Sequence, residues 1–533
     1  MRKLFIWIMV ALSAALLSLP WLVPHCGALA LIGFIPLLCA DAFASELKIK
    51  HFWLYAFSAF ALWNTATTFW VCNATVGGGI FAIVYNSAQM TLVWALFRLS
   101  KKALHGVLPY IFLAAAWIAW ERVYFSMDIS WPWLTLGNAF AQSTRMVQWY
   151  EFTGSLGGSL WVWLVNLGVF GLLVATTDGY WQRWNPVASM SALLGVTLIV
   201  AGPLVLSKVV YDNYEEKSEG SVEVLIGQPN FDPYQKFNSM TQAQQTEALL
   251  SQFRACADTT AGLLFVAPET FTSDVFIDNI DASPTVRAIR GFLSGYKDAR
   301  MLFGASTYEV FHTHAAPSIL SRAYGDGWIQ THNSALLVDA GSQTDLFHKS
   351  RLVVGTELTP YPEIFVPFDD WLSGKLGVSG LMGRCVGQPQ ISLLHCSEDI
   401  PLGCAVCYES VYGEYCTGYV KAGAKAMTVI TNDAWWGDTP GYRQHLSYSR
   451  LRAIELRRDI ARCGNTGISC FIDQKGDITA ETQWWVPAVL RGRVELNSEQ
   501  TAFVRYGDIV GRACTLVFLL MFLLSAVNLI LRR

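Results

Sequence analysis

The chain has 533 residues and is unusually apolar for that length. Hydrophobic residues make up 53% of it and charged residues only 15%, whereas charged residues are about a quarter of an ordinary globular chain. This composition excludes a wholly water-soluble protein and indicates that a large part lies in lipid. The formal net charge of -3, without a long basic run, excludes a nucleic-acid-binding protein.

Eight apolar stretches are long enough to cross a bilayer, which takes about 20 residues. Seven lie in the first 210 residues and one near the C-terminus: 4–23, 27–44, 52–72, 79–99, 106–125, 156–177, 190–210 and 512–531. Arg2 and Lys3 before the first stretch resemble the start of a secretory signal. Six further spans in the same region favour a retained helix instead.

Lysine and arginine concentrate in alternate loops, as expected for cytoplasmic loops of a bacterial membrane protein. With the N-terminus inside, the inner loops hold Lys or Arg at positions 2, 3, 48, 50, 98, 101, 102, 183, 532 and 533, and the short outer loops little beyond Arg145. This predicts a seven-helix transmembrane domain at 1–210, a non-cytoplasmic domain at 211–510 and an eighth transmembrane helix at 511–533. In a bacterial inner membrane the middle domain is then periplasmic.

The middle segment has the pattern of a layered α/β domain. Short apolar runs of strand length recur at 222–227, 263–267, 301–306, 334–340, 402–407 and 426–431. Charge-dotted stretches of helical length lie between some of them, at Ser239–Arg254 and Arg450–Arg462. The alternation of buried strands and helices predicts that reactive side chains follow the strand ends.

Three such side chains are Glu269, Lys349 and Cys407. Taken singly they are ordinary: a glutamate after a strand is usually a cap or a solvated charge, a loop lysine is usually on the surface, and such a cysteine usually belongs to the core. Together they form a chemically complete set. A thiol attacks a carbonyl as thiolate, a carboxylate can take and return its proton, and an ammonium stabilises the resulting oxyanion. The set needs no histidine.

The order of these motifs resembles the nitrilase (carbon–nitrogen hydrolase) superfamily: Pro268-Glu269, then Lys349, then Cys407-Tyr408-Glu409. With eight spans the chain is similar to the membrane branch of that superfamily, the apolipoprotein N-acyltransferase family. The supporting stretches are GQPNFDPYQKF (227–237), TNDAWWGDTPGYRQH (431–445) and RLRAIELRRDIARCGNTGISCFID (450–473).

The resemblance implies an eight-span α-helical transmembrane bundle plus an α/β nitrilase-like domain built as an α-β-β-α sandwich. It also implies that Cys407 is the nucleophile, Glu269 the general base and Lys349 the oxyanion stabiliser. Residues matching the supporting positions of the site are Glu357, Tyr408 and Glu409, and possible substrate-lining residues are Phe237, Asn432 and Trp435. The departures from the family pattern include Phe237, where a tryptophan is expected, and Arg351 in the Lys349 loop.

The reaction implied is a ping-pong acyl transfer. Cys407 takes an acyl chain from a membrane phospholipid as a thioester, and the α-amino group of the diacylglyceryl-cysteine of an apolipoprotein then accepts it as an amide. Neither a metal nor an organic cofactor is required, because the thioester stores the acyl group. The sequence leaves open the oligomeric state, the preferred phospholipid and any disulfide.

Two other functions fit parts of the pattern. A membrane-tethered amidase would use the same residues with water as acceptor, although one anchor would then suffice. A transporter would have paired charges inside its spans, where this chain has few polar residues. Cys404 and Cys407 form a C-x-x-C, but residues three apart on a strand point to opposite faces. The apolar stretch Trp371–Met382 is either a mobile arm that reaches the bilayer or an ordinary surface loop.

Overall fold

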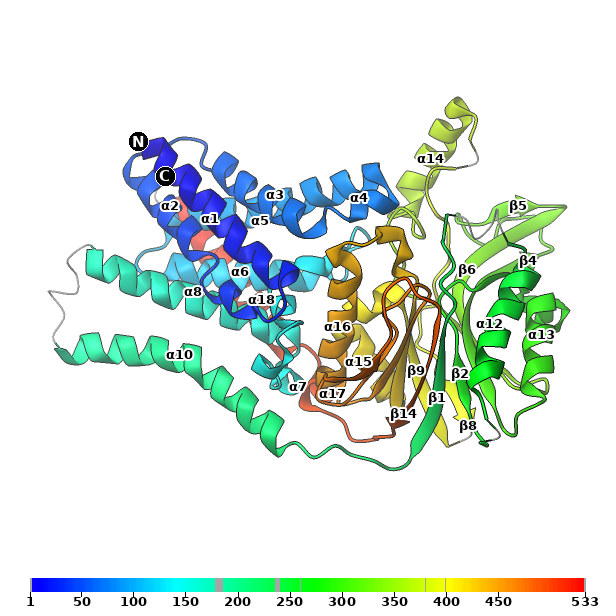
Figure 1. Ribbon diagram of the computed structural model, residues 1–533. Helices are drawn as coiled ribbons and strands as arrows, with labels where there is room; N and C mark the ends of the chain where they lie inside the picture. Colours follow the sequence, from blue (N-terminus) through cyan, green and yellow to red (C-terminus); the bar gives the residue numbers. More distant parts are fainter. Residues whose placement is uncertain are drawn as a thin grey trace.

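The computed structural model describes residues 2–177, 186–234, 240–258, 260–378, 380–397 and 399–531. In Figure 1 a helical bundle, blue to teal with one red helix, stands beside an α/β part that runs from green to orange. Phe237, which was expected to line the substrate, falls outside the described residues.

Each of the eight predicted apolar stretches coincides with a helical segment. The helices are α1 (Arg2–Leu22), α2 (Ile35–Glu46, after the short η1 at Gly27–Leu31), α3 (Trp53–Thr68), α5 (Val76–Ala103), α6 (Leu108–Tyr124), α8 (Ser155–Thr177), α10 (Pro186–Asn213) and α18 (Ile509–Leu531). Within the described residues, six segments are long and apolar enough to span a membrane: α1, Gly27–Glu46, α5, α8, α10 and α18. With 16 and 17 residues, α3 and α6 are shorter. The chain is therefore a membrane protein with several apolar helices.

Aromatic rings form a large part of the interior of the bundle. Phe34 stacks on Trp163 with ring centroids 4.3 Å apart and meets Trp117 edge-on at 5.3 Å. The outer surface of the bundle carries many aliphatic side chains, and on α10 Leu193, Leu194 and Leu198 are exposed. Because such a surface is unfavourable in water, it indicates contact with lipid.

The α/β part contains two sheets. The first has the order β14-β1-β2-β4-β6-β5, with β3 beside β4 and β7 beside β6. Its strands are β1 (Ser221–Gln228), β2 (Leu264–Val266), β3 (Thr272–Phe276), β4 (Arg300–Phe311), β5 (Arg322–Tyr324), β6 (Gly327–Val338), β7 (Thr344–His348) and β14 (Ala488–Glu495). The second has the order β13-β12-β11-β10-β9-β8. Its strands are β8 (Leu394–Ser397), β9 (Ile400–Val406), β10 (Ala426–Thr431), β11 (Ile460–Gly464), β12 (Cys470–Ile472) and β13 (Ile478–Glu481).

The alternation of side chains along β1 shows how the layers pack. Val224 and Ile226 enter the core between the two sheets, while Leu225 faces the helices α12 (Gln242–Cys256) and α13 (Pro284–Leu293). The second sheet is covered by α15 (Gly413–Lys421) and α16 (Pro440–Leu456), so the layers run helix, sheet, sheet, helix (Figure 1). The predicted α/β domain is therefore confirmed.

The helix expected over Arg450–Arg462 is wrong in its second half. The α16 helix ends at Leu456, Arg457 adopts a left-handed φ of 49°, and the chain then enters β11. This strand is fully buried and pairs in parallel with β10, so tertiary pairing overrides the helix-like pattern of charges. Those charges have partners: the Arg458 guanidinium donates to the carbonyls of Ala424 and Glu499.

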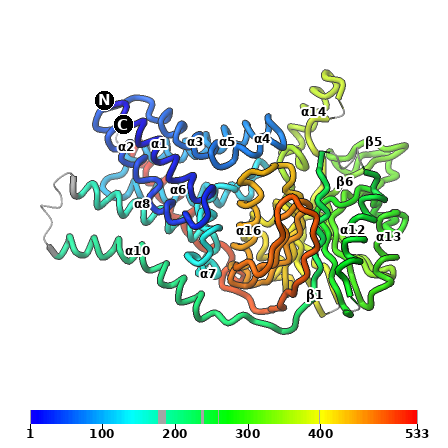
Figure 2. Tube along the Cα trace, viewed as in Figure 1, coloured from blue at the N-terminus to red at the C-terminus, as the bar shows by residue number. Residues whose placement is uncertain are grey.

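The helix α16 also contacts the bundle. Tyr448 donates its hydroxyl proton to the carbonyl of Trp133 at 2.7 Å and accepts a hydrogen bond from the indole of Trp21 at 3.0 Å. Gln444 accepts from the indole of Trp133 at 2.7 Å. The N- and C-terminal ends lie together at the other end of the bundle (Figure 2). The bundle is thus bonded directly to the helix that covers the second sheet.

Candidate active site

The three predicted catalytic residues lie just beyond strand ends of both sheets. Lys349 follows β7 directly, and Glu269 comes three residues after β2, both in the first sheet. Cys407 follows β9 in the second sheet and is the first residue of the short helix η6 (Cys407–Val411). Since the two sheets pack face to face, their strand ends bring together residues that are distant in sequence.

Lys349 lies between two carboxylates. Its Nζ is 2.9 Å from Glu269 Oε1 and 3.0 Å from Glu357 Oε1, and the side chain is 1% exposed. The Asn333 amide, from β6, donates to the same two oxygens at 2.8 and 2.6 Å. An ammonium has three N–H donors, so the two carboxylates leave one for another acceptor.

The charge state of Lys349 follows from these contacts. Burial alone would lower its pKa, but Glu269, Glu357 and the neighbouring Cys407 raise the pKa well above the ordinary lysine value. Lys349 is therefore a permanent cation in the folded protein. A buried cation between two acids is a fixed electrostatic centre rather than a proton donor.

Cys407 occupies a tight turn between β9 and η6. Its φ is 52°, in the left-handed region that residues with a Cβ rarely adopt. Burial, and then the charge of Glu269, raise the pKa of the thiol well above its usual value, while Lys349 opposes the shift. The resting side chain is thus a neutral thiol, and it needs a base at the moment of attack.

Glu409 connects the cysteine turn to the lysine loop. One carboxylate oxygen accepts the backbone N–H of Ser350 at 2.7 Å and of Arg351 at 3.2 Å, and the other accepts that of Val406 at 2.9 Å. The Tyr415 hydroxyl also donates to the first of these oxygens, Oε1, at 2.9 Å. Glu409 therefore fixes the residues that follow Lys349 relative to those that flank Cys407.

Tyr408 points toward the helical bundle. Its hydroxyl donates to the carbonyl of Ser130 at 2.9 Å, and its ring stacks on that of Trp131 with centroids 5.7 Å apart. Both partners follow α6 in the loop that leaves the bundle. The residue after the candidate nucleophile is therefore bonded to the membrane part of the chain.

The two remaining predicted residues lie after β10. Asn432 accepts a hydrogen bond through its side-chain oxygen from the Asn465 amide at 3.1 Å. Trp435 is 38% exposed and meets the ring of Tyr234 edge-on at 5.3 Å. Asn432 is thus hydrogen-bonded to the turn after β11, and the indole of Trp435 is partly exposed.

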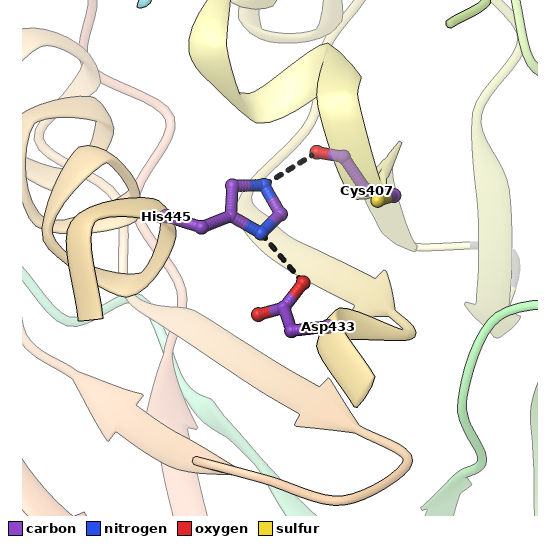
Figure 3. Close-up of side chains that lie close together, drawn as sticks. All are labelled: Cys407, Asp433 and His445. Carbon is purple, nitrogen blue, oxygen red and sulfur yellow. Dashed lines mark hydrogen bonds and ion pairs between the residues drawn. The ribbon is translucent and has the colours of Figure 1, made fainter. Parts of the chain in front are cut away.

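A histidine also lies beside Cys407 (Figure 3). The His445 ring, from α16, bonds Asp433 Oδ1 at 2.9 Å through Nδ1 and the Cys407 carbonyl oxygen at 3.1 Å through Nε2. Arg462 forms an ion pair with the other oxygen of Asp433. Although burial opposes it, His445 and Arg462 hold the pKa of Asp433 down at about 2. The histidine bonds the backbone of the cysteine turn rather than the thiol, so it supports the left-handed turn.

The same group has the composition of a metal site. Ligand atoms of Cys407, Asp433 and His445 lie within 4.8 Å of one another. However, both ring nitrogens of His445 are already hydrogen-bonded, and the Arg462 cation occupies the carboxylate. A guanidinium at that position repels a second cation. The residues therefore fit a support for the turn better than a metal centre.

Sequence reasoning missed Asn333, Asp433 and His445. Asn333 lies within β6, where nothing in the sequence distinguishes it from other polar strand residues. Asp433 and His445 both lie in the stretch 431–445. The signal that could have revealed them is a carboxylate and an imidazole close together in a segment that folding buries.

Two secondary sequence interpretations have a clear place in the structure. Cys404 packs in the core between the sheets, and all twelve cysteines are free, so the C-x-x-C is not a disulfide here. The stretch Trp371–Met382 includes the end of the helix α14 (Pro362–Leu376), which projects from the α/β part (Figure 1). Trp371, Leu376 and Leu381 are exposed.

Comparison with known proteins gives matches over both parts of the chain. The apolipoprotein N-acyltransferase N-terminal domain family matches residues 13–168, and the carbon–nitrogen hydrolase family matches residues 311–502. The apolipoprotein N-acyltransferase of Chlorobaculum tepidum is 28% identical over 516 residues, which cover 95% of this chain and 93% of that protein. That of Geobacter metallireducens is 27% identical over 521 residues, again 95% and 93% of the two chains. A solved carbon–nitrogen hydrolase superfamily structure from Xanthomonas campestris covers 52% of this chain and 91% of its own, with 15% identity and a TM-score of 0.35.

The fold and the site thus define a carbon–nitrogen hydrolase domain attached to a helical membrane domain, an acyltransferase class of enzyme. Both family matches lie in one chain, and its relatives align with it from end to end. The chain is similar to apolipoprotein N-acyltransferases over 95% of its length.

Proposed function

We propose that this chain transfers an acyl chain from a membrane phospholipid, through a thioester on Cys407, to the α-amino group of the diacylglyceryl-cysteine of an apolipoprotein. The observation that carries the proposal is the contact of Lys349 with Glu269 and Glu357 in a domain bonded to an apolar helical bundle. Lipid-anchored donor and acceptor can both reach a site held at a membrane surface.

In the first step Glu269 takes the proton of the Cys407 thiol as the sulfur attacks the ester carbonyl of the phospholipid. The third N–H of Lys349, which Glu269 and Glu357 leave unused, faces the oxyanion that forms. The carbon–oxygen bond of the ester then breaks, and the leaving alkoxide takes the proton back from Glu269. The products are a thioester on Cys407 and a lysophospholipid.

In the second step the neutral α-amino group of the acceptor attacks the thioester carbonyl. A second oxyanion forms at the same position beside Lys349, and Glu269 removes a proton from the attacking nitrogen. The carbon–sulfur bond breaks, an amide forms, and the proton on Glu269 returns to the sulfur. Glu357, Tyr408 and Glu409 support the site in this proposal, and the proposed substrate-lining residues are Phe237, Asn432 and Trp435.

The membrane arrangement in this proposal has eight spans. Residues 1–210 form a seven-helix transmembrane domain, 211–510 a periplasmic catalytic domain and 511–533 the eighth helix, in a bacterial inner membrane. An even number of crossings agrees with the two chain ends lying at one end of the bundle (Figure 2). The two shorter helices α3 and α6, at 1.5 Å per residue about 24 and 25 Å long, require local thinning of the bilayer core.

The proposal is tested with purified full-length protein in detergent and a phospholipid that carries a clickable acyl chain. We expect label on the wild-type protein that hydroxylamine removes, and none on Cys407→Ala. Cys404→Ala is the matched control, because Cys404 is buried between the sheets and carries no role in the reaction. Absence of label on folded wild-type protein, with every phospholipid tried, would contradict the proposal and favour small amides as substrates.

A further inference from the structure

A cavity of about 300 Å³ lies where the bundle meets the α/β part, and Cys407 is not among the residues that line it. It is lined by the end of α6, the start of α8, the start of α15 and the short helix α17 (Ala502–Tyr506), together with Arg351 from the lysine loop. Its charged residues are Arg122, Arg351, Glu414 and Asp508. This volume lies at the lower end of the range of small-molecule pockets.

Three residues that line this cavity each have one buried polar atom without a hydrogen-bond partner among the described residues: Arg122 Nε, Arg351 Nε and Asp508 Oδ2. The first and last are 3.6 Å apart, a loose ion pair. In the described part of the chain, Arg351 has no carboxylate within ion-pair distance, and its guanidinium carbon lies over the rings of Tyr412 and Tyr415 at 5.5 and 5.2 Å. Buried polar groups without partners are costly, so their convergence on one cavity indicates a polar ligand.

The cavity offers charges of both signs. Two guanidinium groups suit a phosphate, which arginine binds with paired N–H groups. Glu414 and Asp508 are the acids, and Glu414 Oε1 already accepts the backbone N–H of Asp508 at 3.1 Å. A purely anionic ligand would leave these carboxylates facing its charge, whereas a ligand with a phosphate and an ammonium satisfies both pairs.

The position of the cavity indicates which class of ligand it binds. Arg122 lies in the last turn of α6, which ends at Tyr124, and Asp508 immediately precedes α18. Both are at the ends of apolar helices that pack against each other, where the headgroups of a bilayer lie. A phosphate at this depth belongs to a lipid.

We propose that this cavity binds the headgroup of a zwitterionic phospholipid, with the phosphate on Arg351 and Arg122 and the ammonium beside Glu414 and Asp508. The inference rests on the proposed membrane arrangement and not on acyl transfer. Because the Arg351 backbone N–H bonds Glu409, the bound headgroup orders the loop that presents Lys349. The headgroup therefore acts on the catalytic cation from a cavity outside the cysteine turn.

The test uses full-length Cys407→Ala, which cannot form the thioester, and counts bound lipid by native mass spectrometry. Phosphatidylethanolamine and phosphatidylglycerol, with the same acyl chains, are titrated separately. We expect phosphatidylethanolamine to bind more tightly. Adding Arg351→Met should lower the affinity for both lipids about tenfold or more, which is the loss expected for a charge-assisted contact. Adding Glu414→Gln should lower the affinity for phosphatidylethanolamine alone, so that the protein no longer prefers it to phosphatidylglycerol.

Two variants guard against loss of folding. Arg351→Lys keeps the cation and should keep most of the binding, and Arg254→Met removes an exposed arginine of α12 as the matched control. Equal binding of both lipids in the parent, or equal loss in Arg351→Met and Arg254→Met, would overturn the inference. Displacement of the lipid by an equimolar amount of soluble glycerophosphoethanolamine would show a free metabolite as the ligand and also overturn it. Because no variant needs turnover, failure here leaves the acyl-transfer proposal standing.

Discussion

The bundle and the α/β part bury opposite kinds of side chain. Among the largest fully buried residues, the bundle contributes tryptophans such as Trp63, Trp94 and Trp117, whereas the α/β part contributes Arg452, Arg458 and Arg462. The surface of the bundle is apolar as well, and it exposes Leu516, Leu520 and other aliphatic residues. The two regions are built for different solvents, lipid and water.

The difference has a physical consequence for the site. A bundle surrounded by lipid can be held by apolar packing and aromatic contacts, because its outer surface needs no charge. The α/β part is stabilised by its own core, and its buried ions are placed where chemistry or junctions need them: Lys349 between two acids, Arg462 on Asp433. Buried Lys349 and Arg462 therefore mark the site and its supporting turn rather than general stability.

If buried charge in the α/β part serves the chemistry, as the contrast with the bundle indicates, the reaction cannot proceed efficiently without the Lys349 cation. We expect Lys349→Met to lower thioester formation at least about 10³-fold, because the oxyanion loses its charged donor. It also leaves the carboxylates of Glu269 and Glu357 close together without a cation, which costs about 3–5 kcal/mol of stability. Labelling with the clickable phospholipid and thermal unfolding measure the two effects. Lys297→Met, on an exposed lysine, is the control, and equal behaviour of the two variants would contradict this account.

Glu269→Gln separates the two roles of that carboxylate. Without the base, thioester formation should fall about 10²- to 10³-fold. The pKa of the Cys407 thiol should fall as well, because after burial the charge of Glu269 is the main factor that raises it. Alkylation of Cys407 by iodoacetamide at pH 8, followed by peptide mass spectrometry, should therefore become faster than in wild type. Slower alkylation together with lost labelling would point to disruption of the turn instead.

Asp459 differs from the paired buried charges of the α/β part. It is a nearly buried acid with no ion-pair partner among the described residues. Burial raises its pKa to about 7. Between its unfolded pKa near 4 and pH 7 the folded state holds the proton more tightly, so stability falls as pH rises through this window. We expect Asp459→Asn, which keeps an acceptor for the Glu495 N–H, to be about 2–4 kcal/mol more stable than wild type at pH 8 and equal to it at pH 4. Melting curves at both pH values test this; an equal difference at both would exclude titration of Asp459.

The smallest effect is expected where the two regions meet. Tyr408→Phe removes one hydrogen bond to Ser130 and keeps the stacking on Trp131, so it should cost about 1 kcal/mol and reduce thioester formation less than about fivefold. Tyr324→Phe, on the exposed strand β5, is the matched control and should change neither quantity. A loss above about 10²-fold in Tyr408→Phe would mean that the bundle controls the nucleophile directly.

Apolar length and short strand-like runs made much of the fold predictable. The stretches 222–227 and 426–431 became β1 and β10 almost residue for residue, since both are central strands buried by neighbours on each side. The error at Arg450–Arg462 arose because a strand with buried arginines looks like an amphipathic helix until its partners are known. Local pattern cannot include the carbonyls and acids that neutralise those charges.

The site was predictable to the extent that its residues follow strands. Glu269, Lys349 and Glu357 were named from the sequence and lie in contact. Asn333 and His445 were not named, because each acquires its importance only through contacts with residues distant in the chain: Asn333 with Glu269, and His445 with the Cys407 carbonyl. Long-range pairing of this kind leaves no spacing for a single sequence to reveal.

The central claim is that the thioester on Cys407 passes its acyl chain to an amine rather than to water. The direct measurement is a chase: wild-type protein labelled from the clickable phospholipid is freed of donor, and a diacylglyceryl-cysteine peptide is added in detergent. The account predicts that label leaves the protein and appears on the peptide as a hydroxylamine-resistant amide, while an otherwise identical peptide with an acetylated N-terminus receives none. Release of the label as free fatty acid at the same rate with either peptide would contradict it and define a hydrolase.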